Sequence, residues 1–303
     1  MTEKLPSYGG QALIEGVLMR GSKTMAAAMR KPDGQIVVET EQLTGIYTNP
    51  LMKTPFLRGV VILWDSMGIG MHYLTVSANM QTGEDEKLEG PALYITLAIS
   101  LLLGICLFFL APAAIGHLAI NFLGWSTWWS NVLEGVMRLI IAVGYIWGIG
   151  KMPDIARVFA YHGAEHKTIN AFEAGAKMTP EVVSHYSVEH PRCGTAFLLT
   201  LIILSIFVFA LLGPLTGVWR YAARLLLILP LASLAYELIR WSSNHLSNPL
   251  VKLIIKPNLA LQHLTTREPS LEMLEVSITA FKTMLEQEQN VVSKPAILAH
   301  ETV

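Results

Sequence analysis

Residues 92–110, ALYITLAISLLLGICLFFL, decide the fold of this chain, because they carry no charge over a length that suits a membrane-spanning helix. A helix needs roughly 20 such residues to cross about 30 Å of hydrocarbon. Three further stretches are apolar over most of their length: Val132–Gly150, Phe197–Leu215 and Tyr221–Trp241. The sequence therefore predicts four transmembrane helices in a mainly α membrane protein.

The composition of the 303 residues agrees with a membrane protein. Hydrophobic residues make up 52% and charged residues 15%, whereas an ordinary globular chain has about 25% charged residues. The net charge of −1 leaves no basic excess to bind a phosphate backbone, so we expect no nucleic-acid partner. Cys106 and Cys193 are the two cysteines and do not suggest a disulfide framework. The lipid bilayer is the partner that this composition predicts.

The first apolar stretch continues past Pro112 to Trp125, which is too long for one untilted crossing. We expect the span to end or kink at Pro112. Residues 113–131 then form an interfacial segment, because the indole rings in it favour the headgroup layer. No signal-peptide pattern is found in residues 1–90, so no cleaved signal peptide is expected.

The basic residues indicate the orientation. They are concentrated in segments 1–90, 151–196 and 242–303, and Arg220 alone lies in the connections 112–131 and 216–220. The positive-inside rule then places both termini and the 151–196 loop in the cytoplasm. An even number of crossings agrees, so we expect a multi-pass protein of the cell membrane.

The polar segments predict a small cytoplasmic α+β portion. In the N-terminal module, residues 1–90, the turn Lys31-Pro32-Asp33-Gly34 lies between two apolar strands and predicts a β-hairpin. Residues 56–80 have the periodicity of an amphipathic helix. The transmembrane region, residues 91–241, contains the 151–196 loop. The tail, residues 242–303, contains a helix after Pro269.

The 151–196 loop carries the residues that could bind a metal. His162, Glu165 and His166 form the pattern His-x-x-Glu-His, in which two imidazoles one helical turn apart bind zinc and the carboxylate takes a proton from bound water. His190 and Cys193 have the spacing of a metal-binding pair, and either could be the third ligand. Three protein ligands leave a fourth zinc position open for water.

Purely structural explanations exist for the same loop. Cys193 could be a small buried apolar residue, Arg192 an anchor at the membrane surface, and His185 an exposed bystander. Asn170 and Glu173 continue the face of the two histidines and could be a further ligand or support the ligands. In the second span, Glu134 and Arg138 are four residues apart and predict a satisfied ion pair rather than a substrate site.

Five blocks, in order along nearly the whole chain, resemble the signatures of the bacterial YqhQ-type membrane proteins: Tyr8–Gly21, Pro55–Gly59, Tyr161–Lys167, His190–Gly194 and Leu264–Pro269. The resemblance implies a multi-pass protein of the bacterial inner membrane. Members of this family are sometimes described as predicted metal-dependent enzymes, a description that gives no substrate. In the first block we expect glycines to let the chain pass close to another backbone, and Glu15 and Arg20 to face the site.

The sequence leaves two hypotheses for function. The first is a zinc-dependent enzyme, a hydrolase, with His162 and His166 as ligands, His190 or Cys193 as the third, and Glu165 as general base. The second is a non-catalytic scaffold that docks a membrane-protein partner or a second copy of itself. There, all four residues would bind a structural metal and leave no position for water.

Overall fold

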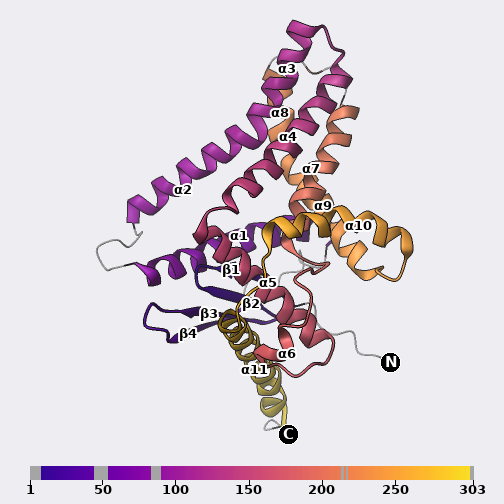
Figure 1. The fold of residues 1–303 in the computed structure, drawn as a ribbon. Coiled ribbons are helices and arrows are strands. Elements are labelled where there is room, and N and C mark those ends of the chain that lie inside the picture. Colours follow the sequence, from indigo (N-terminus) through magenta and orange to yellow (C-terminus); the bar gives the residue numbers. More distant parts are fainter. Residues whose placement is uncertain (1–7, 44–53, 83–89, 213–214, 216–217, 301–303) are drawn as a thin grey trace.

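The computed structural model describes residues 8–43, 54–82, 90–212, 215 and 218–300. It has two parts that share the chain (Figure 1). The apolar helices gather at one end of the molecule, and a four-stranded sheet with its covering helices lies at the other. The start of β1 and the end of α11 both lie at the sheet end, so both ends of the described chain are on one side of the bundle.

The sheet confirms the predicted hairpin and extends it. Strands β3 and β4 pair antiparallel around the Lys31–Gly34 turn, and two further strands precede them in the order β1-β2-β3-β4. The strand bounds are β1 Gly9–Leu13, β2 Gly16–Arg20, β3 Thr24–Arg30 and β4 Ile36–Gln42. The glycine-rich first block is therefore a second hairpin, which the sequence did not predict.

Both faces of the sheet are covered, which explains why β3 is a nearly continuous apolar run. Side chains alternate between the faces of a strand. Val17 and Ala26 pack against α5, Pro153–Glu173, and α11, Leu271–His300. Leu18 and Met25 pack on the opposite face against Tyr73 of α1, Leu57–Gln81. The predicted amphipathic helix is thus one outer layer of this body.

Four helices are long and apolar enough to cross a membrane, as predicted, among the residues that the structure describes. The first runs over Gly90–Leu123 and comprises α2, Gly90–Ile105, a π-helical turn, Cys106–Leu110, and α3, Ala111–Leu123. The others are α4, Thr127–Ile149; α7, Gly194–Leu211; and α8 with α9, Val218–Leu226 and Ile228–Asn244.

The helix of the first span continues beyond Pro112 to Leu123, so it does not end at Pro112, and the interfacial position of residues 113–131 stays a prediction. These residues form the end of α3, a turn at 124–126 and the beginning of α4. Pro112 cannot donate a hydrogen bond to the carbonyl of Phe108. Nε of Arg138 donates to that carbonyl instead, at 3.0 Å. This contact and the π-helical turn let the helix bend between α2 and α3 without ending (Figure 1).

Ion pairs tie the sheet body to the bundle. Nε and Nη2 of Arg58 in α1 donate to the two carboxylate oxygens of Glu237 in α9. The backbone N–H of Phe56 donates to the same carboxylate at 3.1 Å. Two further helices complete the fold: the short α6, Pro180–Val183, and α10, Pro249–Thr265, which packs on α7. Through Phe56 and Arg58, the Pro55–Gly59 block is a contact between the sheet body and the transmembrane helices.

Candidate metal centre

Helix α5 begins directly below the second span and carries both histidines of the predicted motif. Pro153 is at its first turn, where a missing N–H costs nothing. His162 and His166 lie one turn apart on the same side of the helix. His162 is half-buried and His166 is fully buried. The two rings are in edge contact, with centroids 4.4 Å apart.

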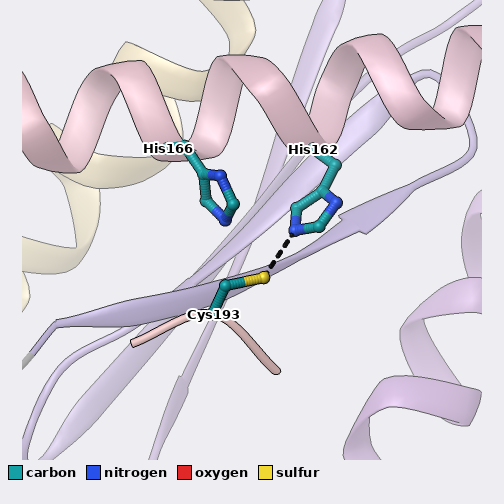
Figure 2. Close-up of side chains that lie close together, drawn as sticks. All are labelled: His162, His166 and Cys193. Carbon is teal, nitrogen blue, oxygen red and sulfur yellow. Dashed lines mark hydrogen bonds between the residues drawn. The ribbon is translucent and has the colours of Figure 1, made fainter. Parts of the chain in front are cut away.

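Cys193 faces these two imidazoles from the segment before α7 (Figure 2). One ligand atom from each of His162, His166 and Cys193 lies within 4.8 Å of the others. Sγ of Cys193 is 3.1 Å from Nε2 of His162. We call these three residues the triad. The structure therefore brings together three of the four predicted ligands.

Backbone carbonyls orient both rings of the triad. Nδ1 of His162 is 2.8 Å from the carbonyl oxygen of Thr265, and Nδ1 of His166 is 2.5 Å from that of Val188. A carbonyl oxygen can only accept, so each Nδ1 carries the proton and donates it. Each Nε2 then carries a lone pair: that of His162 faces Sγ of Cys193, and that of His166 has no hydrogen-bond partner among the described residues. Metal-binding histidines are held in this way, by a hydrogen bond from the nitrogen away from the metal.

The donor set fits a zinc ion. Nε2 of His166 is buried and has no hydrogen-bond partner among the described residues. Such an unsatisfied buried atom is costly and requires an explanation. Two imidazole nitrogens and one thiolate sulfur are ligands that zinc prefers. A zinc ion held by His162, His166 and Cys193 would satisfy this atom.

Cys193 is positioned by the N-terminal end of the third membrane-spanning helix, α7. It is the N-cap of α7, and its sulfur accepts a hydrogen bond from the backbone N–H of Thr195 at 3.4 Å. The N-terminus of a helix favours negative charge. The triad therefore lies where the second span has just ended and the third begins, at the boundary between the bundle and the sheet body (Figure 1).

His190 lies beside the triad without joining it. Its ring centroid is 5.6 Å from that of His166, and its Nε2 is 4.0 Å from Glu173. Burial and then the charge of Arg192 lower the pKa of His190 to about 3, so its ring is neutral at neutral pH. Gln262 holds the backbone of His190 with two hydrogen bonds, of 2.9 and 2.8 Å. Of the two predicted third ligands, Cys193 is the one in the triad.

Glu165 points its carboxyl at β1. A Cβ added to Gly10 would stand 2.5 Å from the backbone oxygen of Leu18 and 3.0 Å from Cδ of Glu165, so only a glycine fits there. Burial raises the pKa of Glu165 to about 7, although the nearby His162 ring and the backbone N–H of Gly10 act in the opposite direction. The first block thus passes close to the predicted motif, as expected from its glycines.

The remaining predicted residues support the loop. Asn170 donates to the carbonyls of Ser187 and Glu189, each at 2.9 Å. Glu173 pairs with Arg192, which is therefore more than a membrane anchor. His185 is exposed, as expected for a bystander. These contacts fix the loop whose Val188 carbonyl orients His166.

Sequence reasoning missed the residues that the last block contributes. The carbonyl of Thr265 orients His162. Lys167, which is buried next to His166, pairs with Glu268 at 2.9 Å. The backbone N–H of Arg267 donates to the carbonyl of Phe159 at 3.0 Å. The Leu264–Pro269 resemblance was the one signal that could have indicated this role.

Fold and site together define the class: a four-span helical membrane protein with a sheet body on one side and a His/His/Cys cluster where the two parts meet. Comparison with known proteins identifies the family to which the chain belongs. The chain belongs to the family described as protein of unknown function (DUF1385), whose model matches residues 54–287. It is 35% identical over 299 residues to the Uncharacterized protein YqhQ of Bacillus subtilis (strain 168), covering 93% of each chain. No solved structure matches. The predicted family is confirmed, while the enzyme activity stays a prediction.

Proposed function

We propose that this chain is a zinc-dependent membrane enzyme, a hydrolase, with its centre at the cytoplasmic face of the bacterial inner membrane. The observation that carries the proposal is the unpartnered, buried Nε2 of His166 beside Nε2 of His162 and Sγ of Cys193. His162, His166 and Cys193 hold the ion. Zinc bound there would act as a Lewis acid and lower the pKa of a bound water.

The protein's own residues prepare this centre. Thr265 and Val188 fix the two imidazoles through their carbonyls. With three protein ligands, one zinc position stays open for a reactant, the arrangement of catalytic rather than structural sites. Glu165 is the predicted general base. The cytoplasmic placement rests on the basic residues of the 151–196 loop and on both ends of the described chain lying on the triad's side of the bundle.

Metal analysis of the purified protein tests the proposal. We expect about one zinc per chain in the wild type. His162→Ala, His166→Ala and Cys193→Ala should each lose most of it. His185→Ala is the matched control, because His185 is in the same loop and exposed, and it should keep its zinc. Equally low zinc in the wild type and in a His162→Ala/His166→Ala double variant would contradict the proposal.

The non-catalytic scaffold is the alternative, and His190 distinguishes it. If a small rearrangement made His190 a fourth ligand, the ion would be fully coordinated and structural. His190→Ala would then lower zinc content. In the enzyme, His190→Ala keeps its zinc, and azide added to the cobalt-substituted protein changes the visible spectrum because a position is open. A partner protein or a second copy of this chain would then dock on the scaffold.

A second catalytic chemistry is favoured by one distance. Sγ of Cys193 lies 3.1 Å from Nε2 of His162, which is the arrangement of a thiol nucleophile and its base. Such an enzyme needs no metal and does not need His166. Iodoacetamide labelling of Cys193 that stays fast in His166→Ala and slows in His162→Ala, in a protein without zinc, would support this chemistry and exclude the zinc enzyme.

A further inference from the structure

A cluster of charged side chains lies inside the membrane-spanning helices, apart from the triad. Glu134 of α4 forms ion pairs with Arg138 at 3.0 Å, with Arg220 at 3.2 Å and with Arg224 at 3.0 Å. The exposed fractions of the four side chains are between 1% and 4%. The predicted Glu134–Arg138 pair is therefore confirmed, but Arg220 is a buried helical residue rather than a loop residue.

The charges in this cluster do not balance. Three guanidiniums face one carboxylate, so two positive charges are left over. The only other carboxylate in residues 90–149 and 194–244 is Glu237, and it pairs with Arg58. The further partners of the arginines, such as Ser130, Asn131 and Ser205, are neutral. Arginine does not lose its proton in proteins, and unbalanced charge in hydrocarbon is costly.

Arg220 also has donors that are not used. Its Nη2 binds Ser130 and Glu134. Its Nε and Nη1 are buried and have no hydrogen-bond partner among the described residues. The side chain is 1% exposed and is therefore held inside the bundle rather than extended to the surface. Unused guanidinium donors next to an excess of positive charge are what an anion requires.

An apolar cavity adjoins the cluster. Its volume is about 240 Å³, and Arg138 and Ser205 lie in its wall beside Phe209. The Phe209 ring also lies under Arg224, 4.9 Å from its guanidinium carbon. The rest of the wall is hydrophobic, with Ala142 and Ile202 among its residues. The site therefore offers an apolar space with Arg138 at its border, and Glu134 links Arg138 to the other two arginines. This arrangement suits a molecule with an acyl chain and an anionic group.

We propose that this cluster and cavity bind an anionic phospholipid. The phosphate accepts hydrogen bonds from Arg220 and offsets the excess charge of the three arginines, and one acyl chain enters the cavity. Glu134 keeps the arginines together and limits their mutual repulsion. Glu134 lies in the first half of α4, toward the α3–α4 turn, and the cavity extends from the arginines along α7 to Leu198.

Native mass spectrometry of the detergent-purified full chain tests the proposal. After lipid removal, the protein is titrated with phosphatidylglycerol, with phosphatidylethanolamine and with inorganic phosphate. We expect one phosphatidylglycerol to bind at least about tenfold more tightly than phosphatidylethanolamine. Both lipids have the phosphate, but the ammonium group of phosphatidylethanolamine cancels the net negative charge that would offset the arginines. Equal binding of the two lipids overturns the proposal. Binding of inorganic phosphate that displaces no lipid shows an anion site without a lipid and overturns it as well.

Two variants test where the lipid binds, and a third variant is the control. Arg220→Gln should lower phosphatidylglycerol binding about tenfold. Ala142→Phe keeps every charge and fills the cavity, so it should lower lipid binding and leave the arginines in place. Arg240→Gln removes an exposed arginine near the C-terminal end of α9, and this variant should bind the lipid as the wild type does. Unchanged binding in both Arg220→Gln and Ala142→Phe overturns the proposal, and if neither variant folds, the wild-type lipid selectivity decides.

Discussion

Gly163 of α5 lies directly against the backbone of Arg267. A Cβ added at Gly163 would stand 2.1 Å from the carbonyl oxygen of Arg267, much closer than the Cβ atoms of real residues approach a neighbouring atom. This approach brings the Leu264–Pro269 segment onto the helix that carries the two histidines. Thr265, two residues earlier, can then accept the hydrogen bond of His162. Two blocks that are about a hundred residues apart in the sequence thus form one side of the metal centre.

Gly163→Ala should separate these two segments. The added methyl group meets backbone, which cannot rotate away, so we expect a loss of about 1–3 kcal/mol in stability. The displaced Thr265 carbonyl no longer fixes His162, so zinc content should fall too. Thermal unfolding in detergent and metal analysis measure the two effects. Gly68→Ala is the control, because that helical glycine of α1 has nothing within 4 Å of the added Cβ, and it should be neutral or slightly stabilising. Equal behaviour of the two variants would contradict the close approach.

Glu165→Gln separates the general base from a metal-binding role. The substitution keeps the shape and an acceptor for the N–H of Gly10, but it cannot take up a proton. We expect zinc content to stay near the wild-type value and activity to fall by roughly 10²–10⁴-fold. Metal analysis and complementation of the phenotype of a deletion strain provide the measurements. A zinc affinity weakened by about 10–100-fold would instead show that Glu165 supports the ligands. Full complementation with zinc retained would argue against the base and favour the scaffold.

Glu15→Gln should lower stability in a pH-dependent way. Glu15 has a positive φ of 52° in the β1–β2 turn, and both of its oxygens accept hydrogen bonds from Arg157 at 2.6 Å. These bonds lower the pKa of Glu15 below 4.5. A lowered carboxyl pKa stabilises the folded state above the unfolded pKa, and this contribution is lost as the pH falls through the folded pKa. We expect a loss of about 0.5–1 kcal/mol at pH 7, because Arg157 is partly exposed.

Melting curves of the Glu15→Gln variant and the wild type should therefore differ at pH 7 and converge as the solution is made more acidic than the usual glutamate pKa. Arg157→Gln should give a similar loss, and the double variant little more than either single one. A difference from the wild type that is the same at every pH would show that the turn, rather than the ion pair, is affected.

Single-cysteine labelling tests the orientation. Lys177 lies in the 151–196 loop and Ser126 in the turn between α3 and α4, and both are exposed. With the loop in the cytoplasm, a membrane-impermeant maleimide added to spheroplasts should label Ser126→Cys, and should label Lys177→Cys only after lysis. Labelling of Lys177→Cys alone in intact spheroplasts would invert the topology and move the metal centre to the outer face.

The sequence by itself determined the features that depend on local pattern. Long apolar runs fix four membrane helices, because hydrocarbon leaves no partner for backbone groups outside a helix. The Lys31–Gly34 turn fixes one hairpin, and the spacing of His162 and His166 places them on one helix face. Tertiary structure alone decided the rest. It chose Cys193 over His190 for the triad, since that choice depends on where α7 begins relative to α5. It also brought Arg220 and Arg224 to Glu134, because the fold places α8 where its arginine side chains reach a carboxylate about 90 residues earlier in the chain.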